Sequence, residues 1–229
     1  MTNAKQASGR HAADLVEDGM TVGLGTGSTV FFTLERLGER IAAEGLRIRG
    51  VPTSIDTERK AGELKIPLAT LAEVGTIDLT IDGADELDPD FNMIKGGGGA
   101  LLREKVVASV SRREVIVVGR DKLVARLGTL CLLPVEVVPF ARATVNRALR
   151  ELGAETTLRL VEAGTTYRTD NHNEILDCQF PGGIADAAEL EQRLALVPGV
   201  VESGLFVGLA HAAVIGADDG SVEVRERGA

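Results

Sequence analysis

The segment TVGLGTGST, residues 21–29, passes from a short apolar strand through a glycine-rich loop into the start of an amphipathic helix. Glycines let the backbone turn sharply and approach a ligand. The Ser and Thr hydroxyls and the N–H groups at a helix start can bind an anion, and phosphate is the natural one. The alternative is a tight strand-to-helix turn capped by Ser28 or Thr29.

Two other nucleotide-binding motifs fit this loop poorly. A dinucleotide fingerprint has glycine at its sixth position, where this chain has Ser28, and an acid at the end of the second strand, where Thr53 and Ser54 stand. A Walker loop requires GKS or GKT, which the segment lacks. The loop therefore favours a small phosphorylated ligand.

Outward from this segment, β-branched runs alternate with amphipathic ones up to about residue 130. The expected strands are Thr21–Leu24, Arg47–Val51, Ile77–Ile81 and Glu114–Val118, and the expected helices are Thr29–Glu44, Ser54–Leu64 and Leu101–Ser111. This alternation predicts βαβ units around a mainly parallel, doubly wound sheet of the Rossmann-like kind. Sites in such sheets lie at the carboxyl ends of the strands.

The order of elements changes near Leu132. The expected elements are strand Leu133–Val138, helix Phe140–Leu152, strands Thr156–Val161 and Glu174–Gln179, helix Asp186–Val197 and strand Val200–Val207. This β-α-β-β-α-β order is ferredoxin-like. We therefore expect an α/β catalytic domain of residues 1–131 plus 205–229 and a smaller ferredoxin-like α+β domain of residues 132–204, in which oligomerisation is expected.

Composition excludes several classes of function. A net charge of −9 over 229 residues disfavours a nucleic-acid partner, because phosphate backbones are bound by an excess of Lys and Arg. No stretch approaches the roughly 18 apolar residues of a membrane span, and residues 1–19 contain no apolar signal core. We expect a cytoplasmic protein with no membrane partner.

The cysteines and histidines give no sign of a metal site or of a Ser/His/Asp triad. Cys131 and Cys178 form no CxxC pair, and the three histidines lack ligand spacing. Two structural thiols in a reducing compartment are expected. Catalysis is left to carboxylates, lysines and the backbone.

Two acids follow the third expected strand. Asp82 and Asp85, in the sequence DGADELD of residues 82–88, would face the site crevice, where close carboxylates tune each other's pKa. The alternative is a solvated acidic turn, which suits Glu86, Asp88 and Asp90. Metal binding is a further option, although the acids lack the EF-hand order of ligands.

The sequence KGGGG, residues 95–99, leads into the helix that carries Glu104. Consecutive glycines cost backbone entropy and indicate exposed N–H groups that line an anion pocket, which Lys95 enters. Glu104 lies about one turn beyond the glycines and can point toward the same space. Its alternative role is that of a first-turn Glu favoured by the helix dipole.

Together these groups suit proton transfer next to a carbonyl. Aldose–ketose isomerisation needs a base that carries a proton between adjacent carbons and a positive or proton-donating group that stabilises the enediolate. The carboxylates and Lys95 can supply both.

In order and spacing, the motifs TGST (26–29), DGAD (82–85), KGGGGA (95–100) and Glu104 resemble those of the type A ribose-5-phosphate isomerases. The similarity extends over nearly the whole chain, including LPVEV (133–137) and TDN (169–171). His172 stands where the family commonly has glycine, a hairpin position outside the site motifs.

The resemblance implies a cofactor-free isomerase of the pentose phosphate pathway that interconverts ribose 5-phosphate and ribulose 5-phosphate, as a homodimer or dimer of dimers. It implies that Glu104 shuttles the proton between C1 and C2, that Asp82 and Asp85 handle substrate hydroxyls and ring opening, and that Lys95 stabilises the enediolate. The residues expected to bind the substrate are Thr26, Gly27, Ser28, Thr29, Asp82, Gly83, Ala84, Asp85, Lys95, Gly96, Gly97, Gly98 and Lys122.

Two other classes of function remain open. A sugar-phosphate sensor would use the same loop without chemistry, but such regulators carry a DNA-reading segment, and only some 20 residues precede the first strand. A coenzyme A transferase would use a glutamate as nucleophile and would require a longer chain. An acyl-CoA incubation would reveal its glutamyl adduct by mass spectrometry.

Overall fold

The computed structural model describes residues 2–161 and 164–228, and its contacts divide the chain into two compact units. The first unit comprises residues 2–84, 103–122 and 209–228, and the second comprises residues 85–102, 123–161 and 164–208. Met1 and Ala229, which bound the expected catalytic domain, and residues 162–163 of the expected smaller domain lie outside the described residues.

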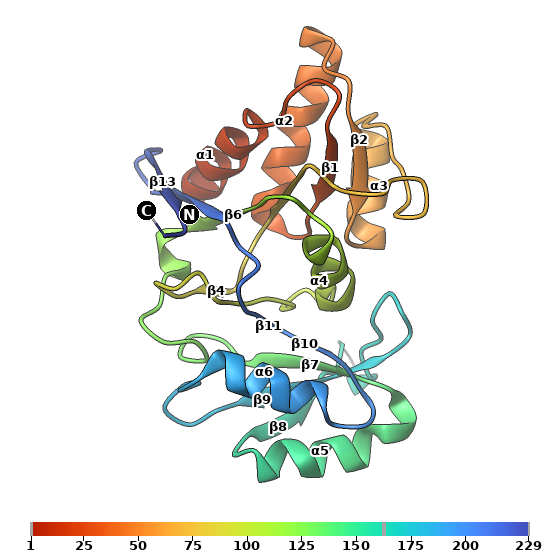
Figure 1. The fold of residues 1–229 in the computed structure, drawn as a ribbon, viewed down its shortest axis with the longest axis vertical. Coiled ribbons are helices and arrows are strands. Elements are labelled where there is room, and N and C mark those ends of the chain that lie inside the picture. The colour runs from red at the N-terminus through yellow and green to blue at the C-terminus, as the bar shows by residue number, and fades with distance from the viewer. Residues whose placement is uncertain (1, 162–163, 229) are drawn as a thin grey trace. The chain divides into compact units, whose positions relative to one another are not determined.

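The first unit is built on a mainly parallel sheet (Figure 1). Within the described chain its order is β13-β12-β6-β3-β1-β2. The strands are β1 (Thr21–Leu24), β2 (Arg49–Pro52), β3 (Leu79–Asp82), β6 (Glu114–Gly119), β12 (Ala212–Gly216) and β13 (Val222–Glu226). All neighbours are parallel except β12 and β13. Because the chain leaves β1 toward β2 and returns on the other side as β3, the topological switch point lies between β1 and β3.

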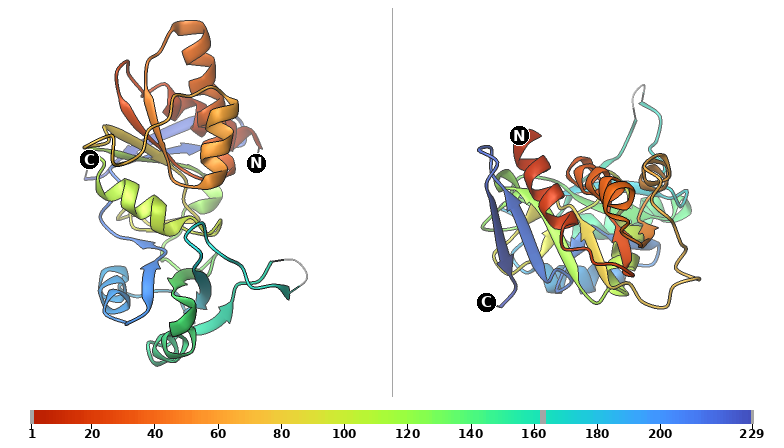
Figure 2. Two further views of the ribbon diagram at one scale, coloured as in Figure 1. Left: turned by 90° about the vertical axis from the view of Figure 1, so that its right-hand side faces the viewer. Right: turned by 90° about the horizontal axis from the view of Figure 1, so that it is seen from above.

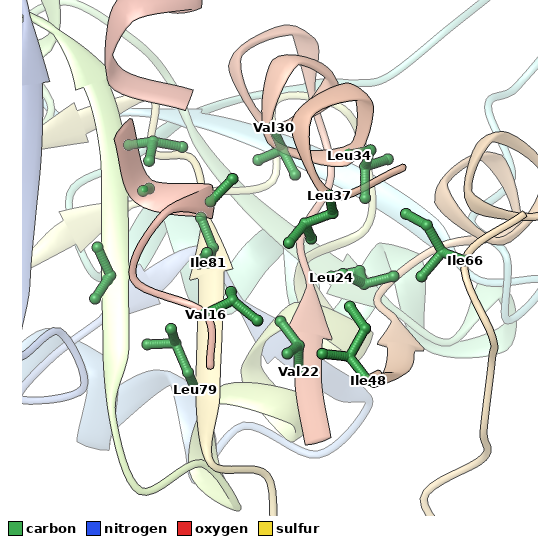
Figure 3. Close-up of a cluster of buried hydrophobic side chains, with 14 of the residues drawn as sticks. Val16, Val22, Leu24, Val30, Leu34, Leu37, Ile48, Ile66, Leu79 and Ile81 are labelled. Atoms are coloured by element: carbon green, nitrogen blue, oxygen red, sulfur yellow. The ribbon is translucent and has the colours of Figure 1, made fainter. Parts of the chain in front are cut away.

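Alternation along the strands assigns each side chain to one face of this sheet. Val22, Leu24, Leu79 and Ile81 point into one apolar core, together with Leu34 and Leu37 of α2 (Ser28–Glu44), which are 1% and 0% exposed (Figure 3). A fully buried leucine contributes about 2 kcal/mol. Helix α2 ends at Gly45, whose left-handed φ of 71° suits glycine. The further helices of this unit are α3 (Ile55–Glu63) and α4 (Leu101–Ser109), whose first two residues belong to the second unit.

The sequence analysis missed helix α1 (Thr2–Ala13), which lies beside the C-terminal strands in Figure 2. Small buried residues, Ala4, Ser8 and Ala12, recur at helical spacing along it. A Cβ on Gly216 would lie 2.0 Å from the Ala4 carbonyl oxygen, and one on Gly9 would lie 2.6 Å from the Thr29 carbonyl oxygen. Backbone contacts of this kind hold α1 in place, so the helix needs no large apolar stripe.

The second unit carries the expected ferredoxin-like arrangement. Its four-stranded sheet within the described residues has the order β10-β7-β9-β8, from β7 (Leu133–Val137), β8 (Glu155–Leu158), β9 (Glu174–Gln179) and β10 (Val200–Ser203). Helices α5 (Arg142–Glu151) and α6 (Ala187–Ala195) bury Val145, Leu149, Leu190 and Leu194 against it. The expected α/β fold class is confirmed, with antiparallel sheets in the smaller part.

Two details differ from expectation. Residues 85–102, 123–131 and 205–208 group with the second unit, where β4 (Glu86–Leu87) and β5 (Met93–Ile94) form a small sheet with β11 (Leu205–Phe206). The expected strand Val200–Val207 is divided between β10 and β11, since Gly204 passes so close to Pro134 and Lys95 that a Cβ there would lie 2.4 Å from the Lys95 carbonyl oxygen. None of the helices in the described part of the chain is long and apolar enough to cross a bilayer.

Glu86 is not part of a solvated turn, contrary to expectation. Its side chain is fully buried, and its carboxylate accepts hydrogen bonds from the backbone N–H groups of Gly128 (2.6 Å), Cys131 (2.8 Å) and Leu130. The carboxylate therefore closes the loop that follows residue 123, and the acidic cluster divides into structural and solvent-facing members.

We expect Glu86→Ala to lower the free energy of unfolding by roughly 2–4 kcal/mol, because three partly buried N–H groups lose their fully buried acceptor. Chemical denaturation measures the change. Asp90→Ala, at an exposed position of the same acidic run, is the matched control and should stay within about 0.5 kcal/mol of the parent. Equal stability of the two variants would contradict a structural role for Glu86.

Candidate active site

The loops that follow β1 and β3 meet at the carboxyl edge of the first unit's sheet. Leu24 pairs with Ile81, and the N–H of Gly25 donates to the Ile81 carbonyl at 3.0 Å. The glycine-rich loop and Asp82 are therefore neighbours, at the switch point where ligands of doubly wound sheets bind.

Asp82 fixes the conformation of the glycine-rich loop. Its buried carboxylate accepts the Thr26 N–H at 3.0 Å and the Gly83 N–H at 2.7 Å through Oδ1. A Cβ on Gly25 would lie 2.2 Å from this same oxygen. Glycine at position 25 is therefore required by the carboxylate that packs on it, and Asp82 joins the two expected site motifs.

Thr26 uses its hydroxyl within the protein. The Oγ1 atom lies 2.8 Å from both Thr53 Oγ1 and Ser54 Oγ, beside the N-terminus of α3. Thr53 and Ser54 thus stand where a dinucleotide-binding protein has its acid, and they anchor the phosphate-loop candidate instead.

The start of α2 has the features of an anion site. Its N-cap is Gly27, with φ 123° and ψ 175°, a conformation that essentially only glycine adopts. Glycine has no side-chain oxygen, so it cannot cap α2 in the way that Ser54 caps the neighbouring α3. The first-turn N–H groups, beginning at Ser28 and Thr29, are thereby left to an external acceptor.

Lys5 is a further candidate for the site that the sequence alone did not indicate. Helix α1 brings its ammonium group to 2.9 Å from Ser28 Oγ, at the N-terminus of α2. The sequence offers no apolar stripe that would mark α1; only the small buried residues Ala4, Ser8 and Ala12 recur there at helical spacing. A cation at this point adds to the attraction that the helix N-terminus exerts on an anion.

Glu104 lies on the first turn of α4 and is 5% exposed. The helix runs antiparallel to the strands. A Cβ on Gly23, the partner of Thr80, would lie 2.8 Å from Val107 Cγ1, whereas the Val110 carbonyl accepts the N–H of Ile77, which precedes β3, at 3.2 Å. Glu104 is three residues before Val107, about 4.5 Å further along the same face. Its carboxylate is therefore carried toward the edge of the sheet that holds Asp82.

The remaining candidates of the first unit follow strands at this edge. Gly83 and Ala84 directly follow β3, and Lys122 ends the short 3-10 helix Arg120–Lys122 after β6. All three are partly exposed. Because β3 and β6 are parallel neighbours, Gly83, Ala84 and Lys122 lie at the same carboxyl end of the sheet.

Lys95 belongs to the second unit and is buried, with 2% of its surface exposed. Its backbone N–H donates to the Gly204 carbonyl at 2.9 Å, and its ammonium group lies 5.3 Å from the centre of the Phe206 ring. Strand β5 and the ring fix a cation in surroundings where its field is little screened by water.

Asp85 and the polyglycine turn are tied together. Asp85 Oδ2 accepts the Gly97 N–H at 2.7 Å, and a Cβ on Gly97 would lie 2.8 Å from Asp85 Oδ1. The Gly99 N–H donates to the Gly96 carbonyl at 2.9 Å. The expectation that all these N–H groups line an anion pocket is therefore wrong for Gly97 and Gly99, because their N–H groups are used within the loop.

Cys131 and Cys178 are free cysteines, and Cys178 is buried. Burial raises the pKa of Cys178 to about 12, with a smaller contribution from Asp177, so its thiol stays protonated at neutral pH. Within the described residues, no three His, Cys, Asp or Glu side chains are grouped as metal ligands would be.

Comparison with known proteins gives a consistent result. Residues 49–220 match the family model described as ribose 5-phosphate isomerase A (phosphoriboisomerase A). A ribose-5-phosphate isomerase A of Gloeobacter violaceus is 54% identical over 221 residues, which are 96% of this chain and 94% of the relative.

Two solved structures have the same fold over almost their whole length. Ribose 5-phosphate isomerase from Plasmodium falciparum superposes with a TM-score of 0.95 at 39% identity and 100% coverage of both chains. A D-ribose-5-phosphate isomerase in complex with phospho-erythronic acid gives a TM-score of 0.93 at 37% identity and 97% coverage of each.

Proposed function

The chain belongs to the ribose 5-phosphate isomerase A family and interconverts ribose 5-phosphate and ribulose 5-phosphate in the pentose phosphate pathway, and from this premise we propose how its side chains divide the reaction. The observation that carries the proposal is the buried Glu104 carboxylate on the helix that runs toward the α2 end of the sheet. A base and an anion site at one sheet edge suit a substrate with a phosphate and a nearby acidic C–H.

The phosphate is proposed to bind at the start of α2. The first-turn N–H groups, the Ser28 and Thr29 hydroxyls and Lys5 can supply its hydrogen bonds, and Lys122 can add a second cation. The 2.9 Å contact between Lys5 and Ser28 supports this role. So does the related isomerase that binds phospho-erythronic acid, since a ligand with a phosphate and a carboxylate requires a site that holds two anionic ends.

Glu104 is proposed to move the proton. It removes the proton from C2 of the open-chain aldose, the electrons form the C1–C2 enediolate, and the same carboxyl group returns the proton to C1 as O2 becomes the ketose carbonyl. Its place supports this role, because a buried side chain in the first turn of a helix is held in a fixed position.

Lys95 is proposed to stabilise the enediolate oxygen, with Gly96, Gly97 and Gly98 shaping the loop around it. Its 2% exposure supports the role, since a cation shielded from water interacts strongly with developing negative charge. Asp82 and Asp85 are proposed to handle the hydroxyl protons and ring opening. Two carboxylates three residues apart on one turn suit that task.

We expect Glu104→Gln to reduce kcat by about 10² or more, because glutamine keeps the shape of the side chain and cannot accept the carbon-bound proton. Ketose formation from ribose 5-phosphate and exchange of solvent deuterium into the sugar both measure the loss. In our proposal the reaction requires no cofactor, so EDTA should leave the parent activity unchanged.

Glu189→Gln is the matched control for Glu104, because Glu189 also lies in the first turn of a helix, α6, at an exposed position. It should retain parent activity. Full activity of a folded Glu104→Gln variant would remove Glu104 from the mechanism. An inactive parent that still binds ribose 5-phosphate would favour the sensor, and a glutamyl adduct formed with acyl-CoA would favour the transferase.

We expect Lys5→Met to raise KM for ribose 5-phosphate about 10-fold, because a charge-assisted contact to the phosphate is worth about 1.4 kcal/mol or more. Turnover of unphosphorylated ribose, compared at the same enzyme concentration, should be unchanged. Arg227→Met, at an exposed position, controls for loss of charge. An equal effect on both sugars would place Lys5 outside the phosphate site.

The second unit is proposed to mediate self-association as a dimer or dimer of dimers, and the first to carry the catalytic base. Phe140 is 99% exposed and Leu196 is 82% exposed. The segments that carry them meet where the Val138 N–H donates to the Gly199 carbonyl at 2.9 Å. Apolar groups gathered in this way suit the core of an interface between two copies.

We expect the parent chain to sediment as a dimer or tetramer at micromolar concentration, and Phe140→Ser with Leu196→Ser to shift it toward monomer. Val224→Thr, an exposed apolar position of the first unit, is the control. A monomeric parent would exclude the proposed oligomer.

A cytoplasmic location is proposed as well, since phosphorylated sugars do not cross membranes unaided and both cysteines are free thiols.

A further inference from the structure

Arg159 reaches the polyglycine loop from the strand region of the ferredoxin-like unit. Its Nη1 donates to the Gly96 carbonyl at 3.0 Å and to the Gly97 carbonyl at 3.1 Å. The other side of the guanidinium is held by Asp177, through Nε to Oδ2 at 2.9 Å and through Nη2 to Oδ1. Both side chains are 15% exposed, so this ion pair is largely shielded from water.

The Gly96–Gly97 peptide connects this ion pair to Asp85. A trans peptide is planar, with its C=O and N–H pointing in opposite directions. The C=O of Gly96 faces Arg159, and the N–H of Gly97 faces Asp85 Oδ2 at 2.7 Å. A cation at the carbonyl end and a carboxylate at the N–H end both stabilise the same peptide dipole, and such chains strengthen each member.

Tyr167 holds the Gly98–Gly99 peptide of the loop. Its hydroxyl donates to the Gly98 carbonyl at 3.2 Å, and its ring lies 5.8 Å from the Arg159 guanidinium carbon. Burial raises the pKa of Tyr167, so the hydroxyl remains a donor at neutral pH. A Cβ on Gly99 would lie 2.1 Å from the Tyr167 oxygen, which leaves room for glycine alone.

We propose that Arg159, supported by Asp177 and Tyr167, is a positioning residue that orients Asp85 and the loop of residues 96–99 for the isomerase reaction. The inference rests on the proposed roles of Asp85 and of this loop. Arg159 and Tyr167, which lie between β8 and β9, hold the carbonyls of Gly96, Gly97 and Gly98, so the loop has one backbone conformation before substrate arrives. Neither Arg159 nor Tyr167 needs to touch the substrate.

The test compares Arg159→Met, Arg159→Lys and Tyr167→Phe with the parent enzyme. We expect Arg159→Met to reduce kcat/KM about 10-fold or more, mainly through kcat, because misplacement of a catalytic group by a fraction of an ångström has effects of this size. Arg159→Lys can hold one carbonyl and should recover part of the loss. Tyr167→Phe keeps the ring and should reduce activity less.

Arg142→Met is the matched control. Arg142 pairs with the buried Glu174 of the same sheet, at 3.3 Å, without contacting the loop in any described hydrogen bond. It should retain parent activity even where its stability falls. Thermal unfolding of every variant separates loss of fold from loss of positioning.

A double-mutant cycle with Asp85→Asn gives the deciding result. If Arg159 acts through Asp85, Arg159→Met should have less than about a third of its fold effect in the Asp85→Asn background. Independent, multiplying effects in a folded protein would overturn the inference, as would a parent-like kcat for Arg159→Met. Absence of isomerase activity in the parent would instead refute the proposed function.

Discussion

The hydrogen bond from the Thr26 N–H to the buried Asp82 carboxylate is the contact on which the first unit's site depends. It joins the loop after β1 to the end of β3, the two strands between which the chain reverses its direction across the sheet. Gly25 is present because this carboxylate occupies its side-chain space. Two further features go with this hydrogen bond. The hydroxyl cluster of Thr26, Thr53 and Ser54 and the glycine cap of α2 both fit the path that the loop takes around the Asp82 carboxylate.

The parallel strands also determine where the proposed site residues gather. All their carboxyl ends lie at one edge, so one short loop after each strand is enough to collect an anion site, a carboxylate and a lysine there. The proposed base, Glu104, lies on α4, which runs back along the opposite face from the α1 and α2 core. The proposed catalytic groups are thus divided between regular elements, and such elements keep a proton donor and acceptor within the small tolerance that proton transfer allows.

Features whose interactions lie close together in the sequence could be predicted, and those that depend on distant partners could not. The β1–α2 turn, Asp82, Asp85, Lys95 and Glu104 stand in short motifs whose glycines and strand periods are visible locally. Lys5 could not be assigned because α1 is held by backbone contacts at Gly9 and Gly216, which leave no apolar stripe. Glu86 was assigned to solvent because its partners lie more than 40 positions away. Arg159 gave no signal, since no spacing in the sequence relates it to Gly96.

The path of the chain between its two units also has a consequence for biosynthesis. Strand β12, which covers the edge of β6 in the main sheet, is translated only after all of the second unit. On the ribosome, β6 therefore presents an unpaired edge while the ferredoxin-like sheet is already able to form. The sheet of the first unit therefore keeps an open edge for longer than the ferredoxin-like sheet does, and an open edge is a place where other chains can pair.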